Sequence, residues 1–256
     1  LSALENKIVT RLKTVECTGK IEMFGEKFHC WKKKGHGVVN MRSAIKRSCD
    51  VYFYEIARRL GVDRLSETAK KFGLGKKILT EIAEEKPGVV PSTSWKKKNI
   101  GQNWYLGETL HSGIGQGYFL STPIQLCLMT AQIANGGFEI KPRIIFDKKD
   151  NSLENYLKFK KENPDQILPL NLLTQNFGLN PLFKDQENIK IIQDAMYSSS
   201  NEPGGTSYRS RLEDERYTFA GKTGSSQIRR FTEAQREAEV KQKQLDYKNR
   251  EHALFI

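Results

Sequence analysis

The sequence has little that would mark a membrane-spanning, repetitive or nucleic-acid-binding protein. Its 256 residues hold no run approaching the roughly 20 apolar residues that cross a bilayer, and no apolar stretch follows a basic N-terminus. There is no internal repeat, no basic helix interleaved with aromatic residues and no RNA-binding signature. The sequence therefore predicts no membrane span within these residues, and we expect no nucleic-acid partner.

Positive charge is in excess, with 42 Lys and Arg against 30 Asp and Glu, a net +12. Such an excess attracts nucleic acid, anionic lipid or an anionic glycan. The lysines are scattered, however, and the simpler interpretation is a lysine-rich proteome. With 38% hydrophobic and 10% aromatic residues a packed core is expected. The chain starts without Met, and residues 253–256 look like the beginning of a buried strand, so we expect a domain that is incomplete at both ends.

The pattern of apolar residues predicts an α+β chain made of four regions. These are a Cys/His loop region at 13–40, a mainly helical lobe at 41–135, a surface insertion at 144–187, and a helix with sheet strands at 188–256. Together they would form a single incomplete domain, residues 1–256.

Within these regions, Asn40 predicts the start of one helix that reaches Ile56 and carries Ser48. Ser121-Thr122-Pro123 predicts the start of a largely buried helix with Cys127 in the core. Surface loops are expected at 76–110, a strand at 217–224 and an exposed charged helix at 231–250.

Two short motifs carry the chemistry: Ser48-Cys49-Asp50 and Lys222-Thr223-Gly224-Ser225. Each is weak alone, but together they fit the serine acyl-transferases, which combine Ser-x-x-Lys, Ser-x-Asn or a variant, and Lys-Thr-Gly. Ser48 suits the relay of a proton to a leaving amine. Lys222, Thr223 and Ser225 suit the binding of a substrate carboxylate, and the backbone amide of Ser225 suits half of an oxyanion hole.

These motifs stand among further blocks of sequence in a fixed order. The chain resembles the class B penicillin-binding proteins of the elongation, or rod-shape, type. The matching blocks are Cys30-Trp31-Lys32-Lys33-Lys34-Gly35-His36-Gly37, Ser48-Cys49-Asp50-Val51-Tyr52-Phe53-Tyr54, Gly61-Val62-Asp63-Arg64-Leu65, Gly113-Ile114-Gly115-Gln116-Gly117-Tyr118, Asn201-Glu202-Pro203-Gly204-Gly205-Thr206 and Ala220-Gly221-Lys222-Thr223-Gly224-Ser225.

The resemblance implies the penicillin-binding transpeptidase fold, related to serine beta-lactamases: an antiparallel sheet flanked by helices, beside an all-helical lobe. It implies a peptidoglycan D,D-transpeptidase that cross-links stem peptides through a serine acyl-enzyme, needs no cofactor for catalysis and binds beta-lactams. It also implies lipid-linked glycan strands as substrate, a rod-system glycosyltransferase and scaffold proteins as partners, and the periplasmic face of the bacterial inner membrane as location.

The family's Ser-x-x-Lys nucleophile is expected to lie outside this chain, so the chain alone should be inactive. Ser43-Ala44-Ile45-Lys46 fits the pattern but lies on the expected helix of Ser48, pointing about 140° away from it, and is expected to be a decoy. Asp50 stands where many relatives have Asn, which marks the elongation type.

Cys17, Cys30, His36 and Cys49 fall within 33 residues, and such a set of thiolates and an imidazole suits a structural zinc ion. A disulfide between Cys17 and Cys30, or unpaired thiols, are the alternatives. Zinc would fasten the loop to the helix that carries Ser48. Two rival functions are also open: a noncatalytic interaction module that keeps the penicillin-binding fold, and a basic zinc-binding nucleic-acid protein.

Overall fold

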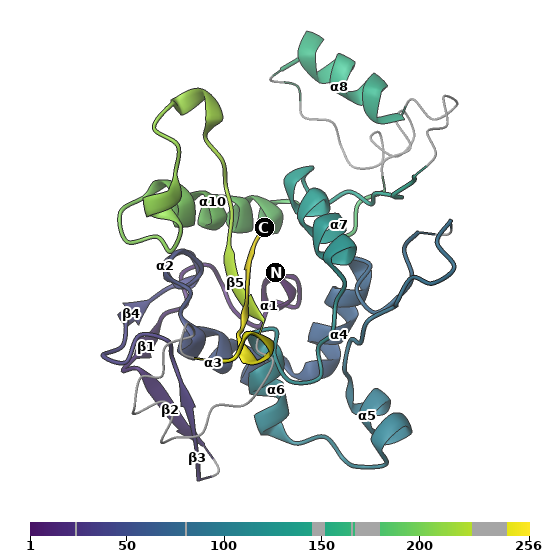
Figure 1. Cartoon of the computed structure of the whole chain (residues 1–256). Helices are drawn as coiled ribbons and strands as arrows, with labels where there is room; N and C mark the ends of the chain where they lie inside the picture. Colours follow the sequence, from purple (N-terminus) through teal and green to yellow (C-terminus); the bar gives the residue numbers. More distant parts are fainter. Residues whose placement is uncertain (24, 80, 145–151, 165, 167–179, 227–244) are drawn as a thin grey trace. The chain divides into compact units, whose positions relative to one another are not determined.

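The computed structural model describes residues 1–23, 25–79, 81–144, 152–164, 166, 180–226 and 245–256 (Figure 1). The chain divides into two compact units: residues 1–10, 60–104 and 118–193 form the first, and residues 11–59, 105–117 and 194–256 form the second. Helices and short antiparallel strands are both present, as an α+β chain requires. Among the described residues no helix has the length and apolar character needed to cross a membrane.

The first unit is mainly helical. It contains α1 (Ser2–Glu5), α4 (Val62–Lys71), α5 (Thr93–Ile100), α7 (Pro123–Ala134), α8 (Ser152–Glu162) and the start of α10 (Glu187–Asn201). Its core includes two apolar clusters, one around Leu74 and Val90 and one around Phe72 and Ile189. α7 begins as predicted, because Thr122 caps it and Pro123 occupies its first turn.

Two predictions for residues 76–134 were wrong. Residues 76–110 are not all loop: Ser92 accepts a hydrogen bond from the Trp95 amide and so starts α5, while α6 (Leu106–Gly113) begins within the same range. Cys127 is exposed, because the buried residues of α7 are Gln125, Leu128 and Gln132. The two glutamine amides donate to backbone carbonyl groups, so burial of polar side chains replaces the apolar face that was expected.

The second unit starts with four short strands. β1 (Val15–Cys17) pairs with β4 (Gly37–Val39), and β2 (Lys20–Met23) pairs with β3 (Glu26–His29), both antiparallel. A Cβ atom on Gly19 would lie 2.0 Å from the Lys33 carbonyl oxygen, and one on Gly35 would lie 2.1 Å from that of Cys17. Only glycine allows these loops to interlock, and the interlock brings the Cys/His region together.

The predicted long helix after Asn40 is two helices. Asn40 and Ser43 form a reciprocal cap at the start of α2 (Met41–Arg47), as expected, but α2 ends at Ser48 and α3 (Asp50–Leu60) follows. Ser48 has φ 54° and ψ 55°, the left-handed conformation that terminates a helix. The prediction that Ser48 lies inside one continuous helix, with Ser43 on it, was therefore wrong.

The other described residues of the second unit form α6, the end of α10, three short 3-10 turns (Tyr208–Ser210, Glu215–Tyr217, Tyr247–Asn249) and two strands. β5 (Thr223–Ser226) and β6 (His252–Phe255) are antiparallel and run side by side (Figure 1). The predicted strand at 217–224 thus begins late, and β6 is a strand but is exposed rather than buried. Residues 231–244 of the predicted charged helix lie outside the described residues.

Candidate active site and Cys/His centre

Ser48 lies in a strained turn between α2 and α3. A left-handed backbone conformation costs a residue other than glycine about 1–2 kcal/mol, and this position in a helix end usually belongs to glycine. The turn is held by bonds from the Ser48 amide to the Ile45 carbonyl (3.2 Å) and from the Cys49 amide to the Ala44 carbonyl (2.9 Å). A serine kept at such a position is a sign that its hydroxyl has a function.

That hydroxyl meets Lys222, which precedes β5. The Nζ of Lys222 donates to Ser48 Oγ (3.0 Å), to the Thr223 carbonyl oxygen (2.7 Å) and to Thr223 Oγ1 (3.3 Å). These three acceptors use the three protons of an ammonium group. Ser48 Oγ is therefore a hydrogen-bond acceptor here, and its own proton is left to point elsewhere.

The register of β5 determines which backbone groups are available beside Lys222. Lys222 and Ile256 exchange both of their backbone hydrogen bonds, at 2.7 and 3.1 Å, and Ser225 is opposite Ala253. In an antiparallel pair bonded and non-bonded positions alternate, so the N–H of Ser225 points away from β6. Thr223 and Ser225 also share one face of the strand, since side chains alternate along it.

Asp50 begins α3, and its Oδ2 accepts a hydrogen bond from the backbone amide of Trp31 at 2.9 Å. Burial raises the pKa of Asp50 to about 7, although the hydrogen bond from Trp31 acts to lower it. Burial also lowers the pKa of Lys222, to about 8, while the charge of Asp50 opposes that change. The site therefore contains an acid and a base whose pKa values are close to neutral pH, which is typical of functional sites.

The side chains of Ser43 and Lys46 each bond to a different residue. Ser43 Oγ bonds to Asn40 in the helix cap, and Lys46 Nζ lies 2.7 Å from Glu202 Oε2. Arg42 pairs with the same carboxylate and with Asp194 of α10. These contacts agree with the expectation that Ser43 is a decoy.

Cys17, Cys30, His36 and Cys49 come together as a buried cluster, with their ligand atoms all within 4.8 Å of one another. The three thiols are free. His36 Nδ1 lies 3.6 Å from Cys17 Sγ and 3.5 Å from Cys30 Sγ. Sulfur and nitrogen ligands of a tetrahedral zinc ion, at about 2.3 and 2.05 Å from the metal, are about 3.6 Å apart, so these two distances from His36 fit such an ion.

The pKa shifts of Cys30 and His36 also suit a soft metal ion. A hydrogen bond from Cys49 lowers the pKa of Cys30 far below the usual thiol range, and the same bond raises that of Cys49. Burial lowers the pKa of His36, which favours the neutral imidazole that binds metals. His36 Nε2 is buried and has no hydrogen-bond partner within the described residues.

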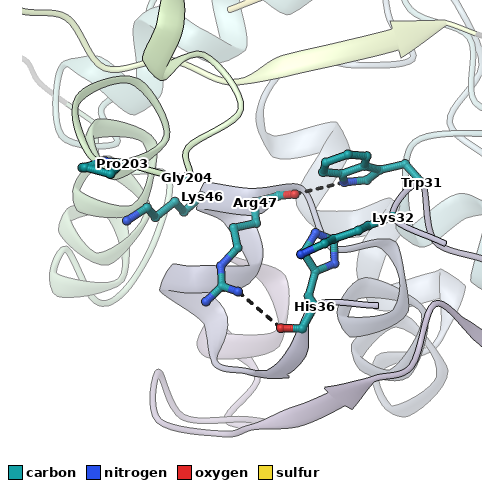
Figure 2. Close-up of a pocket in the computed structure, with 7 residues that line it drawn as sticks. All are labelled: Trp31, Lys32, His36, Lys46, Arg47, Pro203 and Gly204. Carbon is teal, nitrogen blue, oxygen red and sulfur yellow. Dashed lines mark hydrogen bonds between the residues drawn. The ribbon is translucent and has the colours of Figure 1, made fainter. Parts of the chain in front are cut away.

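Trp31 connects this cluster to the Ser48 turn. Its indole Nε1 donates to the Arg47 carbonyl oxygen (3.0 Å), and its ring lies edge-on to His36 at 5.4 Å. These residues line a cavity of about 340 Å³. Figure 2 shows Arg47 donating to the His36 carbonyl oxygen beside it. The other lining residues are Lys32, Lys46, Pro203 and Gly204.

The structure thus brings Ser48, Lys222 and Thr223 into hydrogen-bond contact, with Asp50 near enough for its charge to act on Lys222, and separately assembles the four Cys and His residues. Two contacts were missed from the sequence. Thr206 Oγ1 accepts from Thr223 Oγ1 at 2.9 Å, and Trp31 binds Asp50 through its backbone. Both residues stand in the matching sequence blocks, which was the available signal, but a block does not reveal which atoms touch.

The family model named "Penicillin binding protein transpeptidase domain" matches residues 1–244. The chain belongs to this family. Among curated proteins, the peptidoglycan D,D-transpeptidase MrdA of Acinetobacter baumannii is 34% identical over 233 residues, which cover 90% of this chain and 31% of that protein. The chain thus spans about a third of the length of this relative.

Two solved structures have the same fold. The complex between the penicillin-binding protein PBP2 and MreC from Helicobacter pylori matches with a TM-score of 0.77 and 30% identity, over 99% of this chain and 40% of that chain. Pseudomonas aeruginosa PBP2 in complex with WCK 5153 matches with a TM-score of 0.74 and 30% identity, over 99% of this chain and 49% of that chain. The expected penicillin-binding transpeptidase fold and the resemblance to the elongation type are confirmed.

Proposed function

We propose that this chain is part of the transpeptidase domain of a peptidoglycan D,D-transpeptidase that works in cell-wall elongation. The observation that carries the proposal is the 3.0 Å hydrogen bond from Lys222 Nζ to Ser48 Oγ, which joins residues 174 positions apart in the sequence. A partly buried ammonium group with a lowered pKa beside a strained serine is an arrangement suited to proton transfer.

In the proposed reaction the lysine of the Ser-x-x-Lys motif takes the hydroxyl proton of the nucleophilic serine, which attacks the carbonyl carbon of the penultimate D-Ala of a stem peptide. The bond to the nitrogen of the terminal D-Ala then breaks, and that nitrogen must gain a proton to leave. Ser48 gives its hydroxyl proton to the leaving amine and receives one from Lys222, because its oxygen already accepts from Nζ. An amine of a neighbouring strand then takes the acyl group, with the proton transfers reversed.

Substrate recognition is assigned to β5. The hydroxyls of Thr223 and Ser225 would bind the terminal carboxylate. Lys222 would attract it through charge, since its three N–H bonds already have acceptors inside the protein. The outward N–H of Ser225 would stabilise the oxyanion of the tetrahedral intermediate.

The nucleophile is proposed to lie outside residues 1–256, in the family's Ser-x-x-Lys motif, within a single transpeptidase domain that is incomplete in this chain. Beta-lactams are proposed to acylate the same serine. A place on the periplasmic face of the inner membrane, and partners of the rod system, including a glycosyltransferase and a scaffold protein such as the MreC found with the Helicobacter pylori relative, belong to the same proposal.

The Cys/His centre is proposed to hold a structural zinc ion, ligated by Cys17, Cys30, His36 and Cys49. The burial of all four residues, their mutual spacing and the lowered pKa of Cys30 support this assignment. The ion would fix the Cys49 thiolate and with it the turn of Ser48, one residue away. Catalysis itself would need no cofactor.

Release of D-alanine from a pentapeptide stem by the complete protein tests the proposed activity. The wild type should release D-alanine, and Ser48→Ala should slow release by about 10²-fold or more, since general acid–base catalysis contributes on that order. Ser200→Ala removes a buried hydroxyl of α10 that bonds to the Ser207 hydroxyl at 3.1 Å; it serves as the matched control and should retain activity. A folded, complete wild type that releases no D-alanine would favour a noncatalytic module with the same fold.

A further inference from the structure

The segment after α10 is pressed tightly against that helix. A Cβ atom on Gly205 would lie 2.2 Å from the Ser199 carbonyl oxygen, so no larger residue fits without a shift of the backbone. Ser207 donates to the same oxygen from its amide (3.2 Å) and from its hydroxyl (3.1 Å). Ser198, Ser199 and Ser200 are fully buried. The backbone around Thr206 is therefore held firmly against α10.

Thr206 contacts two parts of the site, the end of α2 before Ser48 and Thr223 of β5. Its backbone N–H donates to the Lys46 carbonyl oxygen (3.1 Å), two residues before Ser48. Its Oγ1 accepts from Thr223 Oγ1 (2.9 Å) and bonds to Ser199 Oγ (3.2 Å). Thr223 Oγ1 in turn accepts from Lys222 Nζ (3.3 Å). A chain of hydroxyl groups thus runs from α10 through Thr206 to the Lys222 ammonium.

We propose that Thr206 is a positioning residue for carboxylate recognition, acting through the hydroxyl of Thr223. The inference rests on the proposed function, in which Thr223 binds the carboxylate of the substrate or of a beta-lactam. Thr206 itself is not assigned a contact with either ligand.

The physical reason is the number of protons available. A threonine hydroxyl has one proton, and Thr223 gives its proton to Thr206 in this structure. When a carboxylate takes that proton, Thr206 can reverse its role and donate to Thr223 Oγ1, because a hydroxyl both donates and accepts. The Thr223 oxygen then keeps its place and its two partners. A valine at position 206 would have the same shape but could not donate.

The test compares acylation of the complete protein by two probes, a penicillin as its free carboxylate and the same penicillin as its methyl ester. Thr206→Val removes both hydrogen bonds of the Thr206 hydroxyl, of which only the one to Thr223 leads to the carboxylate, so acylation by the free carboxylate should fall about 2- to 12-fold. Acylation by the ester should stay within about twofold, and the loss should be in binding rather than in the acylation step. Thr206→Ser should restore the rate with the free carboxylate.

Each variant is judged by its acid-to-ester ratio, which does not depend on the fraction of protein that is folded. Thr206→Ala should lower the ratio as Thr206→Val does. Ser200→Ala removes a comparable hydrogen bond, the one between the Ser200 and Ser207 hydroxyls (3.1 Å). That bond does not lead to Thr223, so the ratio should stay unchanged. An unchanged ratio in Thr206→Val, or equal losses with both probes, overturns the inference. A wild type that forms no adduct overturns the proposed function, and this inference with it.

Discussion

Replacement of Lys222 by Met should make the protein more stable and at the same time much less active. Met has a similar length but carries no charge and no donor. Burial lowers the pKa of Lys222 from 10.5 to about 8, so the charged form is disfavoured in the folded protein by about 3 kcal/mol. Since Lys222 is only partly buried, we expect Lys222→Met to raise the free energy of unfolding by about 1–3 kcal/mol at pH 7.

The pH dependence has a definite sign. The pKa of Lys222 is about 8 in the folded state and 10.5 in the unfolded state, so the unfolded state binds more protons between these two pH values. The stability of the wild type should therefore rise with pH across this window. The advantage of Lys222→Met should be complete below pH 8 and should disappear near pH 10.5.

The assay is urea unfolding of the complete protein at several pH values, with acylation by a beta-lactam measured in parallel. Acylation should fall about 10²-fold or more, because Ser48 loses its donor. The matched control is Lys46→Met. Lys46 is paired with Glu202 and its side chain is 17% exposed, so this variant should lose about 1 kcal/mol and keep its activity. A Lys222→Met protein that is less stable than the wild type by 1 kcal/mol would refute the reasoning.

Three further perturbations have clear expected outcomes. Cys49→Ser should abolish the binding of one zinc ion per chain in metal analysis, whereas substitution of the exposed Cys127 should not. A purified wild-type protein that contains no bound zinc would contradict the assignment. Glu202→Gln should cost about 1–2 kcal/mol at pH 7, and since its partners lower the pKa of Glu202 to about 2, urea unfolding should show the difference vanishing as the pH falls from 4.5 to 2. Gly205→Ala should cost about 1–3 kcal/mol in urea unfolding, because its Cβ would overlap the α10 backbone, whereas Gly107→Ala, whose nearest neighbour would be at 3.5 Å, should be tolerated; equal costs would refute the packing argument.

Local signals in the sequence were sufficient for several elements. Asn40 and Thr122 accept hydrogen bonds from amides three residues later, so the starts of α2 and α7 follow from residue type and spacing. The family, and with it the fold, followed from the order of several sequence blocks.

Features that depend on distant contacts could not be predicted in this way. The break at Ser48 was missed because serine carries no signal for a left-handed conformation, which is imposed by the surroundings. The burial of Gln125 and Gln132 depends on carbonyl groups of other segments that accept their amide protons. The link from Thr206 to Thr223 depends on the close approach at Gly205, which no local pattern encodes.

The most direct test of the central claim is the intact mass of the complete protein after incubation with a beta-lactam, followed by mapping of the modified residue. We predict one covalent adduct on a serine outside residues 1–256, formed much more slowly in Ser48→Ala and in Lys222→Met. An adduct on Ser43 would contradict the assignment of that residue as a decoy. No adduct on a folded, complete protein would contradict the transpeptidase mechanism itself.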